Sequence, residues 1–408
     1  MHALVVGGGI AGTTTAIALA KAGIDATVHE AHDRDSEGVG GWLTLASNGI
    51  DALATLGLGA EVTAHGHPTR TMRLSNHTGR VLAEFPMAPE RPDGLKVHTV
   101  RRCDLHRVLR AAATARAIPV RFGKRLVDAT PRPGGGVIAR FADGDHVEAD
   151  LLVGADGLRS AVRTIIDPAA PAARYTGLLN TGGYATGATL PPRFRADPGV
   201  IEFCFGRNCF LGYTLAPDSS IWWFANPAAR QKLGRAELAA ISEDDWRRRL
   251  HALFAGDELP AATLVDGSAH IFAGWNTYDF PTVRTWHRDD MIIVGDAAHA
   301  ASPASGQGAS MAIEDAVTLA RCLRDSTSVP AAFAGYESLR RARVEKVVEQ
   351  GRRNGTGKTA GPIARVIRDR VIMPMVASRA ARTGASPSEW LFGHHIDWET
   401  PVRATPRP

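Results

Sequence analysis

The stretch ALVVGGGIAGTTTAIALAKAGIDATVHE, residues 3–30, decides the fold of this 408-residue chain. It begins with four apolar residues, as a strand buried in a parallel sheet does. The glycine motif GGGIAG at 7–12 follows directly, and an Ala-rich helix is expected over about 11–22. A second strand, over about 26–29, ends on Glu30. The order of strand, glycine turn, helix and strand predicts a βαβ unit of a doubly wound α/β sheet.

The glycines of this motif have separate physical roles. Gly7 allows the tight turn, Gly9 lets the backbone approach a pyrophosphate, and Gly12 lets helix and strand pack closely. The free N–H groups and the dipole at the helix start favour phosphates. Glu30, eighteen residues after Gly12, is placed to accept hydrogen bonds from ribose hydroxyls, and its charge disfavours a 2′-phosphate. The stretch therefore predicts a site for FAD or NAD rather than NADP.

Two later segments repeat the pattern of an apolar strand that ends in glycine and aspartate. They are ADLLVGADG over 149–157, which ends at Asp156-Gly157, and DMIIVGDAAH over 290–299, which contains Gly295-Asp296. Ligands of open α/β sheets bind at the carboxyl ends of the strands. Both turns are therefore candidate ligand contacts, although each could also be an ordinary turn.

The second of these segments leads through Pro303 and the glycines of GQG at 306–308 into an expected helix over about 309–323. The start of this helix would present backbone N–H groups and a positive dipole end to an anion. A flavin needs such a site, because reduction leaves negative charge on its N1–C2=O edge. The helix dipole could stabilise that charge by roughly 0.3–2 kcal/mol.

The composition restricts the class of protein. With 44% hydrophobic and 22% charged residues the chain is globular, which excludes a disordered chain, a coiled coil and a collagen-like fibre. Forty-seven basic and 42 acidic residues leave a formal charge of +5. The arginine clusters at 247–249 and 340–343 are interpreted as solvated helix faces, because no interleaved aromatic residues indicate nucleic-acid binding.

Cysteine usage and hydropathy indicate the compartment. The four cysteines form no CxxC and no Cys/His metal spacing, so a reducing cytoplasm is expected rather than a disulfide framework. No apolar run reaches the roughly 18 residues needed to cross a bilayer. The N-terminus is not a signal peptide, because a strand and a glycine motif begin at Ala3.

Together the motifs resemble the signatures of the single-component FAD-dependent aromatic hydroxylases. This para-hydroxybenzoate hydroxylase-like family also contains tetracycline-inactivating and kynurenine monooxygenases. The resemblance rests on the glycine motif with Glu30, on the turn at 154–157 and on the block from 295 to 308, and it spans about residues 1–350.

The resemblance implies bound FAD and a set of contacts to it. Arg102, in an Arg-x-x-Leu helix start, would contact the ribityl-pyrophosphate part, while segment 40–53 would run past the flavin ring and strand 123–126 would meet the adenine. The cofactor-binding residues expected are Gly7, Gly9, Ile10, Ala11, Gly12, Glu30, Gly41, Trp42, Arg102, Leu126, Asp156, Gly157, Gly295, Asp296, Gly306 and Gly308. Pro303 would lie against the reactive face, and the expected catalytic residues are Pro303, Gly306, Gln307 and Gly308.

Residues 68–100 and 175–285 alternate apolar and polar positions between turn residues, as antiparallel strands do. In the resembling family such a sheet covers the flavin and forms the substrate pocket. Trp222 and Trp223 cannot both line it, because successive strand residues face opposite sides. The substrate contacts expected are Leu43, Thr44, Phe203, Tyr213 and Trp222, although aromatic residues on strands belong more often to an ordinary core.

These assignments predict an α/β fold. It comprises a Rossmann-like FAD-binding domain, an interleaved antiparallel β-sheet substrate domain and a C-terminal helical region. The expected division is 1–67, 101–174 and 286–350 for the FAD-binding domain, 68–100 and 175–285 for the substrate domain, and 351–408 for the C-terminal helical cap.

Two features near the C-terminus suggest other chemistry. GTGK at 355–358 is similar to the end of a phosphate-binding P-loop, but Arg352 stands where the first glycine belongs and a charged helix precedes it. The tail EWLFGHHIDW at 389–398 is rich in histidine and aromatic residues, yet a third metal ligand is missing. No metal is expected, and the tail is predicted to pack near the active site.

The resemblance implies a monooxygenase in which FAD is reduced by NADPH or NADH and reacts with O2 to form a C4a-hydroperoxide. This would hydroxylate a small electron-rich aromatic substrate such as a phenol, an indole or a polyketide. The absence of a second GxGxxG fits a transient nicotinamide co-substrate. A flavin oxidase or oxidative cyclase on the same scaffold and a non-catalytic flavin- or ligand-binding protein remain alternatives. A cytoplasmic monomer or homodimer without nucleic-acid or membrane partners is expected.

Overall fold

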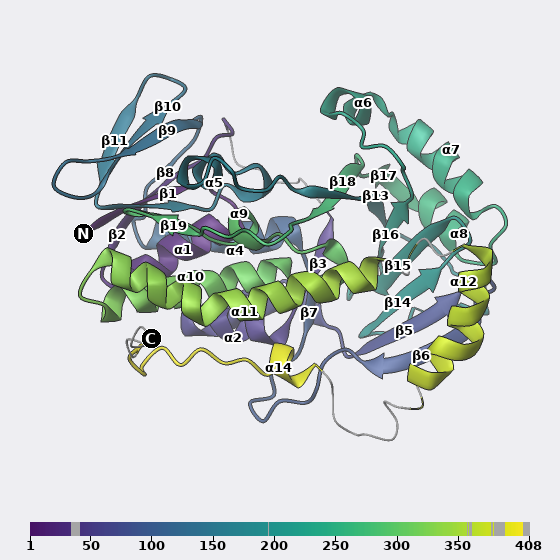
Figure 1. Ribbon diagram of the computed structural model, residues 1–408. Coiled ribbons are helices and arrows are strands. Elements are labelled where there is room, and N and C mark those ends of the chain that lie inside the picture. Colours follow the sequence, from purple (N-terminus) through teal and green to yellow (C-terminus); the bar gives the residue numbers. More distant parts are fainter. Residues whose placement is uncertain are drawn as a thin grey trace.

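The fold-deciding stretch forms β1 (His2–Val6), α1 (Ile10–Lys21) and β2 (Asp25–His29) in a computed structural model of the protein (Figure 1). The expected order of strand, helix and strand is confirmed. The helix stops before Gly23, whose φ of +76° favours glycine. The structure describes residues 1–33, 41–194, 196–356, 358, 361–376, 378 and 388–402.

A six-stranded sheet in the order β19-β20-β12-β1-β2-β8 contains this unit. The strands from β20 to β8 are parallel, and β19 pairs antiparallel with β20. Because β1, β12 and β20 are parallel neighbours, the glycine turns that follow them lie at one edge of the sheet. The added strands are β8 (Val120–Arg121), β12 (Leu151–Gly154), β19 (His287–Arg288) and β20 (Met291–Ile293).

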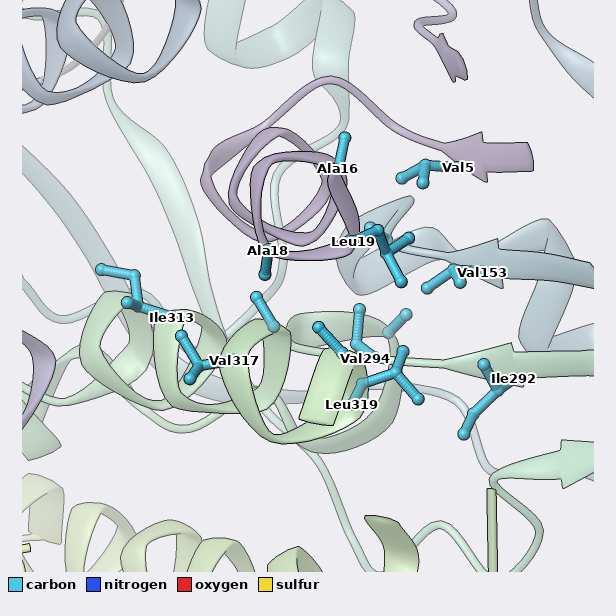
Figure 2. Close-up of a cluster of buried hydrophobic side chains, with 14 of the residues drawn as sticks. Val5, Ala16, Ala18, Leu19, Val153, Ile292, Val294, Ile313, Val317 and Leu319 are labelled. Carbon is cyan, nitrogen blue, oxygen red and sulfur yellow. The ribbon is translucent and has the colours of Figure 1, made fainter. Parts of the chain in front are cut away.

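Helix α1 packs against α10 (Gly308–Asp325) beside this sheet, and their apolar side chains form the main core (Figure 2). Val5 and Val153 of the strands lie close to Leu19 of α1 in this cluster. Gly12 makes the close approach possible, because a Cβ there would stand 1.8 Å from the Gly7 carbonyl oxygen. The tight packing expected at Gly12 is therefore present.

A second sheet has the order β17-β13-β16-β15-β14-β5-β6, with β18 paired to β13. It is antiparallel as expected, except that β14 runs parallel to β5. These two strands come from separate insertions, so no hairpin dictates their relative direction. The strands are β5 (Thr71–Asn76), β6 (Val81–Pro86), β13 (Arg174–Ala185), β14 (Val200–Phe205), β15 (Cys209–Leu215), β16 (Ile221–Pro227), β17 (Ser268–Ile271) and β18 (Trp275–Asp279).

Three helices, α6 (Arg235–Ala240), α7 (Glu243–Phe254) and α8 (Ala261–Asp266), lie beside this second sheet (Figure 1). Helix α7 begins with a capping box in which the Ser242 hydroxyl accepts from the Asp245 N–H. Its apolar side, which includes the fully buried Trp246, joins one face of the sheet in a second core. That face is closed, so only the opposite face can line a site.

The remaining elements connect these layers. Strands β9 (Leu126–Pro131), β10 (Val137–Phe141) and β11 (His146–Ala149) form one small sheet, and β3 (Trp42–Leu45), β7 (His98–Arg101) and β4 (Gly66–Pro68) form another. The other helices are α2 (Ser47–Thr55), α3 (Gly59–Ala64), α4 (Arg102–Ala115), η1 (Gly157–Arg159), α5 (Ala161–Ile166), α9 (Asp296–His299) and η2 (Pro303–Ser305).

Helix α11 (Val329–Thr356) runs from beside the six-stranded sheet towards the second sheet (Figure 1). It is followed by α12 (Pro362–Ile367), by the π-helical η4 (Arg368–Ile372) and by α14 (Glu389–Phe392). Within the predicted cap, positions 357, 359–360, 377, 379–387 and 403–408 lie outside the described residues. Across the described ranges no helix is both long and apolar enough to cross a membrane.

The arginines of α11 correct the interpretation of 340–343 as a solvated face. Arg340 is 1% exposed, and its guanidinium pairs with Glu314 and with Asp315 of α10. Arg343 also pairs with Glu314, at 2.8 Å. An isolated sequence pattern cannot distinguish a solvated arginine from one that neutralises a buried carboxylate on another helix.

Candidate active site

The first glycine loop joins β1 to α1 and leaves the helix start open. Gly7 has a φ of +105°, and a Cβ there would stand 2.4 Å from the Ala155 carbonyl oxygen. Gly9, the N-cap residue of α1, carries no side-chain cap, and a Cβ built on it would meet nothing within 4 Å. The first-turn N–H groups of a twelve-residue helix are thus available to an anion.

Glu30 at the end of β2 holds this loop in place. Its Oε2 accepts a hydrogen bond from the Gly8 N–H at 2.6 Å, and its Oε1 accepts one from the His32 N–H at 2.9 Å. The Gly8 carbonyl oxygen accepts in turn from Arg110. The carboxylate therefore supports the glycine turn after β1, a role that the motif alone does not reveal, and each oxygen retains a lone pair for a further donor.

The turn after β12 is built differently from the first. Asp156 uses Oδ2 to accept from the N–H groups of Ala161 and Val162, at 2.7 and 3.2 Å, and so caps α5. Its Oδ1 is buried and has no hydrogen-bond partner within the described part of the chain. Burial raises the pKa of Asp156 above its usual value. Gly157, at a φ of +73°, faces the cavity instead.

The turn after β20 places a carboxylate in the cavity. Gly295 has a φ of +59°, and Asp296 starts α9 with its side chain exposed to the cavity. Enclosure within the cavity raises the pKa of Asp296, although the positive charge of Arg102 opposes that rise. His299 is buried and its Nε2 lies 2.5 Å from Asp315 Oδ2, so it supports the loop and does not face the cavity.

A second helix start faces the same space. Gly306 adopts a φ of +62°, and α10 begins at Gly308 without a side-chain cap. Gln307 is only 2% exposed, and its Oε1 accepts from the Asn48 amide at 3.3 Å. The same amide nitrogen donates to Glu314 at 2.6 Å. The starts of α1 and α10, far apart in sequence, thus border one cavity with open N–H groups.

This cavity has a volume of about 2090 Å³, which exceeds the roughly 300–1,000 Å³ usual for a single ligand. The predicted residues that line it are Gly9, Ile10, Ala11, Gly41, Trp42, Leu43, Thr44, Arg102, Gly157, Phe203, Asp296, Pro303, Gly306, Gln307 and Gly308. The predicted residues outside its lining are Gly7, Gly12, Glu30, Leu126, Asp156, Tyr213, Trp222 and Gly295.

The opposite wall is the open face of the second sheet. Phe224 of β16 lies across Gly212 of β15, where a Cβ would stand 2.3 Å from the ring, so glycine is required there. Phe224 also approaches Trp42, with ring centroids 5.4 Å apart. The other apolar side chains of the sheet that line this wall include Met72, Leu74, Phe85, Ile201, Phe203, Phe205 and Phe210.

Two of the residues expected to contact the substrate, Tyr213 and Trp222, do not line the cavity. Tyr213 belongs to the buried core shared with α7, on the closed face of the sheet. Trp222 packs edge-on against His67 and Tyr184, away from the cavity lining. Strand alternation shows which residues share a face of the sheet. It does not show which face, or which end of the strand, reaches the cavity, because the neighbouring layers decide that.

Several lining residues escaped the sequence analysis, among them Phe224, Asn226 and Lys358. The spacing of Phe224 and Asn226, two apart on β16, is a signal for a shared face. Lys358 lies in the rejected P-loop similarity, and nothing in that segment indicates that it reaches a strand 132 residues away.

These residues fit a flavin dinucleotide. The two open helix starts suit the negatively charged groups of such a cofactor. Arg102 faces the same cavity and forms no ion pair with any described residue. The Asp296 carboxylate can accept from hydroxyl groups, and the aromatic wall can cover a ring system. Fold and site together define an α/β dinucleotide-binding protein with an adjoining apolar pocket.

Sequence comparison identifies the family. The chain matches the FAD binding domain family over residues 1–351. It is 30% identical to aurachin C monooxygenase/isomerase of Stigmatella aurantiaca over 93% of this chain and 96% of that protein. It is 31% identical to 3-amino-4-hydroxybenzoate 2-monooxygenase of Streptomyces cremeus, with 86% and 85% covered.

Structural comparison agrees with this assignment. The crystal structure of Klebsiella pneumoniae HpxO with FAD and uric acid has a TM-score of 0.77 and 26% identity, and covers 96% of this chain and 95% of that one. The chain belongs to the FAD-binding-domain family of FAD-dependent aromatic hydroxylases and is an FAD-dependent oxidoreductase. The expected family, fold class and cofactor are thereby confirmed.

Proposed function

We propose that the protein uses NADPH or NADH and O2 to hydroxylate a small electron-rich aromatic compound, such as a phenol, an indole or a polyketide-like ring. One observation carries the proposal: a single cavity joins two open helix starts on one side to an apolar aromatic wall on the other. A flavin and a ring substrate can share that space. Two similar proteins support a small ring substrate. One is named as a monooxygenase of 3-amino-4-hydroxybenzoate, and the other, HpxO, is described in complex with FAD and uric acid.

Different residues would bind different parts of FAD. Gly9, Ile10 and Ala11 would bind the diphosphate of FAD, Arg102 would neutralise it, and Asp296 would accept from ribityl hydroxyls. Outside the cavity lining, Glu30 would hold the loop and the ribose. Bound FAD would supply the redox chemistry, which is its reduction by NAD(P)H and the delivery of one oxygen atom from O2.

The chain itself would provide position and electrostatics. The positive end of α10, at Gly306 to Gly308, would stabilise negative charge on the flavin by up to about 2 kcal/mol. Asn48 donates a hydrogen bond to Gln307 Oε1 at 3.3 Å, which would help this loop to keep its shape when the flavin is bound. Pro303 lines the cavity and would limit the position of the substrate. The phenylalanine wall would exclude water from the reacting atoms.

The test is aerobic consumption of NADH and NADPH by the purified yellow protein with a panel of phenols, indoles and polyketides, followed by product mass. A product heavier by one oxygen atom supports the proposal. A product lighter by two hydrogens would indicate an oxidase or cyclase instead. Bound FAD that neither NADH nor NADPH reduces would indicate a non-catalytic flavin protein.

The proposal includes a cytoplasmic setting, where NAD(P)H is available, with the enzyme as a monomer or homodimer. All four cysteines are free in the structure, which supports a reducing compartment. The division into an FAD-binding domain, a substrate domain and a C-terminal cap belongs to the same proposal. The separate six- and eight-stranded sheets support it.

A further inference from the structure

A lysine from the C-terminal part of the chain lines the aromatic wall of the cavity. The Lys358 ammonium donates a hydrogen bond to Asn226 Oδ1 at 2.7 Å. It also lies over the ring of Phe210, 4.4 Å from the centroid, and 5.6 Å from that of Phe224. The hydrogen bond and the two rings hold Nζ at the open face of the second sheet.

No described carboxylate pairs with this ammonium group. The one hydrogen bond leaves two of its three donor positions available. A charge removed from bulk water costs free energy unless a counter-charge offsets it, and cation–π contacts compensate only in part. Burial accordingly lowers the pKa of Lys358 to about 8.

The charged groups around Lys358 do not supply the missing partner. Cys209, on β15, stays a neutral thiol because burial raises its pKa far above the usual value. Arg368 stacks on Phe205 and pairs with its neighbour Asp369 at 2.8 Å. Arg353 adds a further positive charge to the lining and pairs with Glu349 at 2.9 Å. Arg353 and Arg368 thus have their own carboxylate partners, and Lys358 is left with no carboxylate among the described residues.

We infer that Lys358, held in place by Asn226, binds an anionic oxygen of the aromatic substrate, either a ring carboxylate or a phenolate. This inference rests on the proposed function, because it assigns the substrate of that site to the acidic or ionised aromatic compounds. The ammonium group would orient the ring by its charged end, while Phe210 and Phe224 contact its apolar part.

Calorimetric titration of the FAD-loaded protein tests this without turnover. The probes are benzoate against neutral benzamide, and pentafluorophenol, ionised at neutral pH, against pentafluorobenzene. We expect each anion to bind more tightly than its neutral partner. Lys358→Met should weaken binding of at least one anion about 10- to 100-fold and leave the neutral probes unchanged. Lys358→Arg should retain part of the preference, and Lys232→Met, at an exposed position, should retain all of it.

The two anionic probes distinguish which group of the substrate, a carboxylate or a phenolate, Lys358 binds. Loss of benzoate binding alone identifies a carboxylate, loss of pentafluorophenolate binding alone identifies a phenolate, and either supports the inference. In the unaltered protein, affinity for the anion should fall as the pH is raised from 7 to 9.5, because Lys358 loses its proton near pH 8. This pH series decides the question even if a variant does not fold.

The inference is overturned if neither anion binds saturably, if the anions bind no better than their neutral partners, or if Lys358→Met binds both anions normally. Its failure is distinct from failure of the proposed function. Anion binding through Lys358 without NAD(P)H-dependent oxygenation would refute only the activity. Oxygenation of uncharged rings without anion preference would refute only the role of Lys358.

Discussion

At the scale of single residues, two glycines of the same motif, Gly9 and Gly12, face different surroundings: Gly12 packs against the protein's own backbone, whereas Gly9 faces open space. A Cβ on Gly12 would collide with the Gly7 carbonyl oxygen at 1.8 Å, so the packing of helix against strand requires glycine at this position. A Cβ on Gly9 would meet no protein atom within 4 Å, and its φ of −75° suits any residue. No described residue explains glycine at position 9 sterically, and the proposed function assigns its open side to the diphosphate of FAD.

This contrast predicts different effects of the same substitution. Gly9→Ala should change the free energy of unfolding of the FAD-free protein by no more than about 0.5 kcal/mol. It should weaken FAD binding about tenfold or more, because a methyl group would occupy the approach of the diphosphate. Gly12→Ala should destabilise the fold itself by about 3 kcal/mol or more. Urea unfolding and FAD fluorescence titration measure the two effects, and equal loss of stability in both variants would contradict the division.

At the scale of secondary-structure elements, buried charges fasten α10 to α11. Burial alone would raise the pKa of Glu314, but the guanidinium groups of Arg340 and Arg343 outweigh it and lower the pKa to about 2. Asp315 is held ionised in the same way by His299 and Arg340. Glu314 also accepts from Asn48, which contacts Gln307 at the cavity. The helix pairing thus supports the loop at the start of α10.

Removing one partner of this network should be costly. Arg340→Met leaves Glu314 and Asp315 buried with less positive charge beside them, and we expect a loss of about 3–5 kcal/mol in unfolding free energy. Arg352→Met, which breaks an exposed pair with Glu349 on the same helix, should have a much smaller effect because solvent screens that pair. Chemical denaturation of both variants at pH 7 checks this, and similar losses would show that the buried network adds little.

The same network of buried charges predicts that the free energy of unfolding depends on pH. The pKa of Glu314 is lower in the folded protein than its ordinary value of 4.5, so its ionised form stabilises the fold above about pH 4.5. That contribution is lost as the pH falls towards about 2. The stability advantage of the natural protein over Glu314→Gln should therefore shrink between these pH values. Urea unfolding at pH steps from 6 to 2.5 measures it, and a constant difference would be inconsistent with the lowered pKa.

At the scale of the whole molecule, three stretches of the chain meet at one edge of the six-stranded sheet. Parallel pairing of β1, β12 and β20 brings their turns together, and α10 adds its own start from a fourth position. A ligand that bridges these turns links most of the fold. Its removal should therefore affect the stability of the molecule as a whole.

FAD should accordingly stabilise the protein by mass action. At a free FAD concentration of 100 times Kd, the gain is about 2.7 kcal/mol, which raises the thermal midpoint by a few degrees. Differential scanning calorimetry with and without added FAD measures the shift. For Gly9→Ala, tenfold weaker binding leaves about 1.4 kcal/mol of this gain at the same concentration, so its shift should be about half as large. An equal shift in this variant would contradict the role of its backbone.

The sequence by itself determined the FAD-binding fold and cofactor, because each turn is a local pattern of strand, glycine and aspartate whose geometry is set by neighbouring residues. The cavity-lining residues Gly9, Asp296 and Gly308 follow from such patterns. The tertiary structure decided which strand face lines the cavity, as Tyr213 and Trp222 show, and placed Lys358 beside Asn226. Those outcomes depend on packing between segments far apart in the chain, and no local pattern encodes a contact across 132 residues.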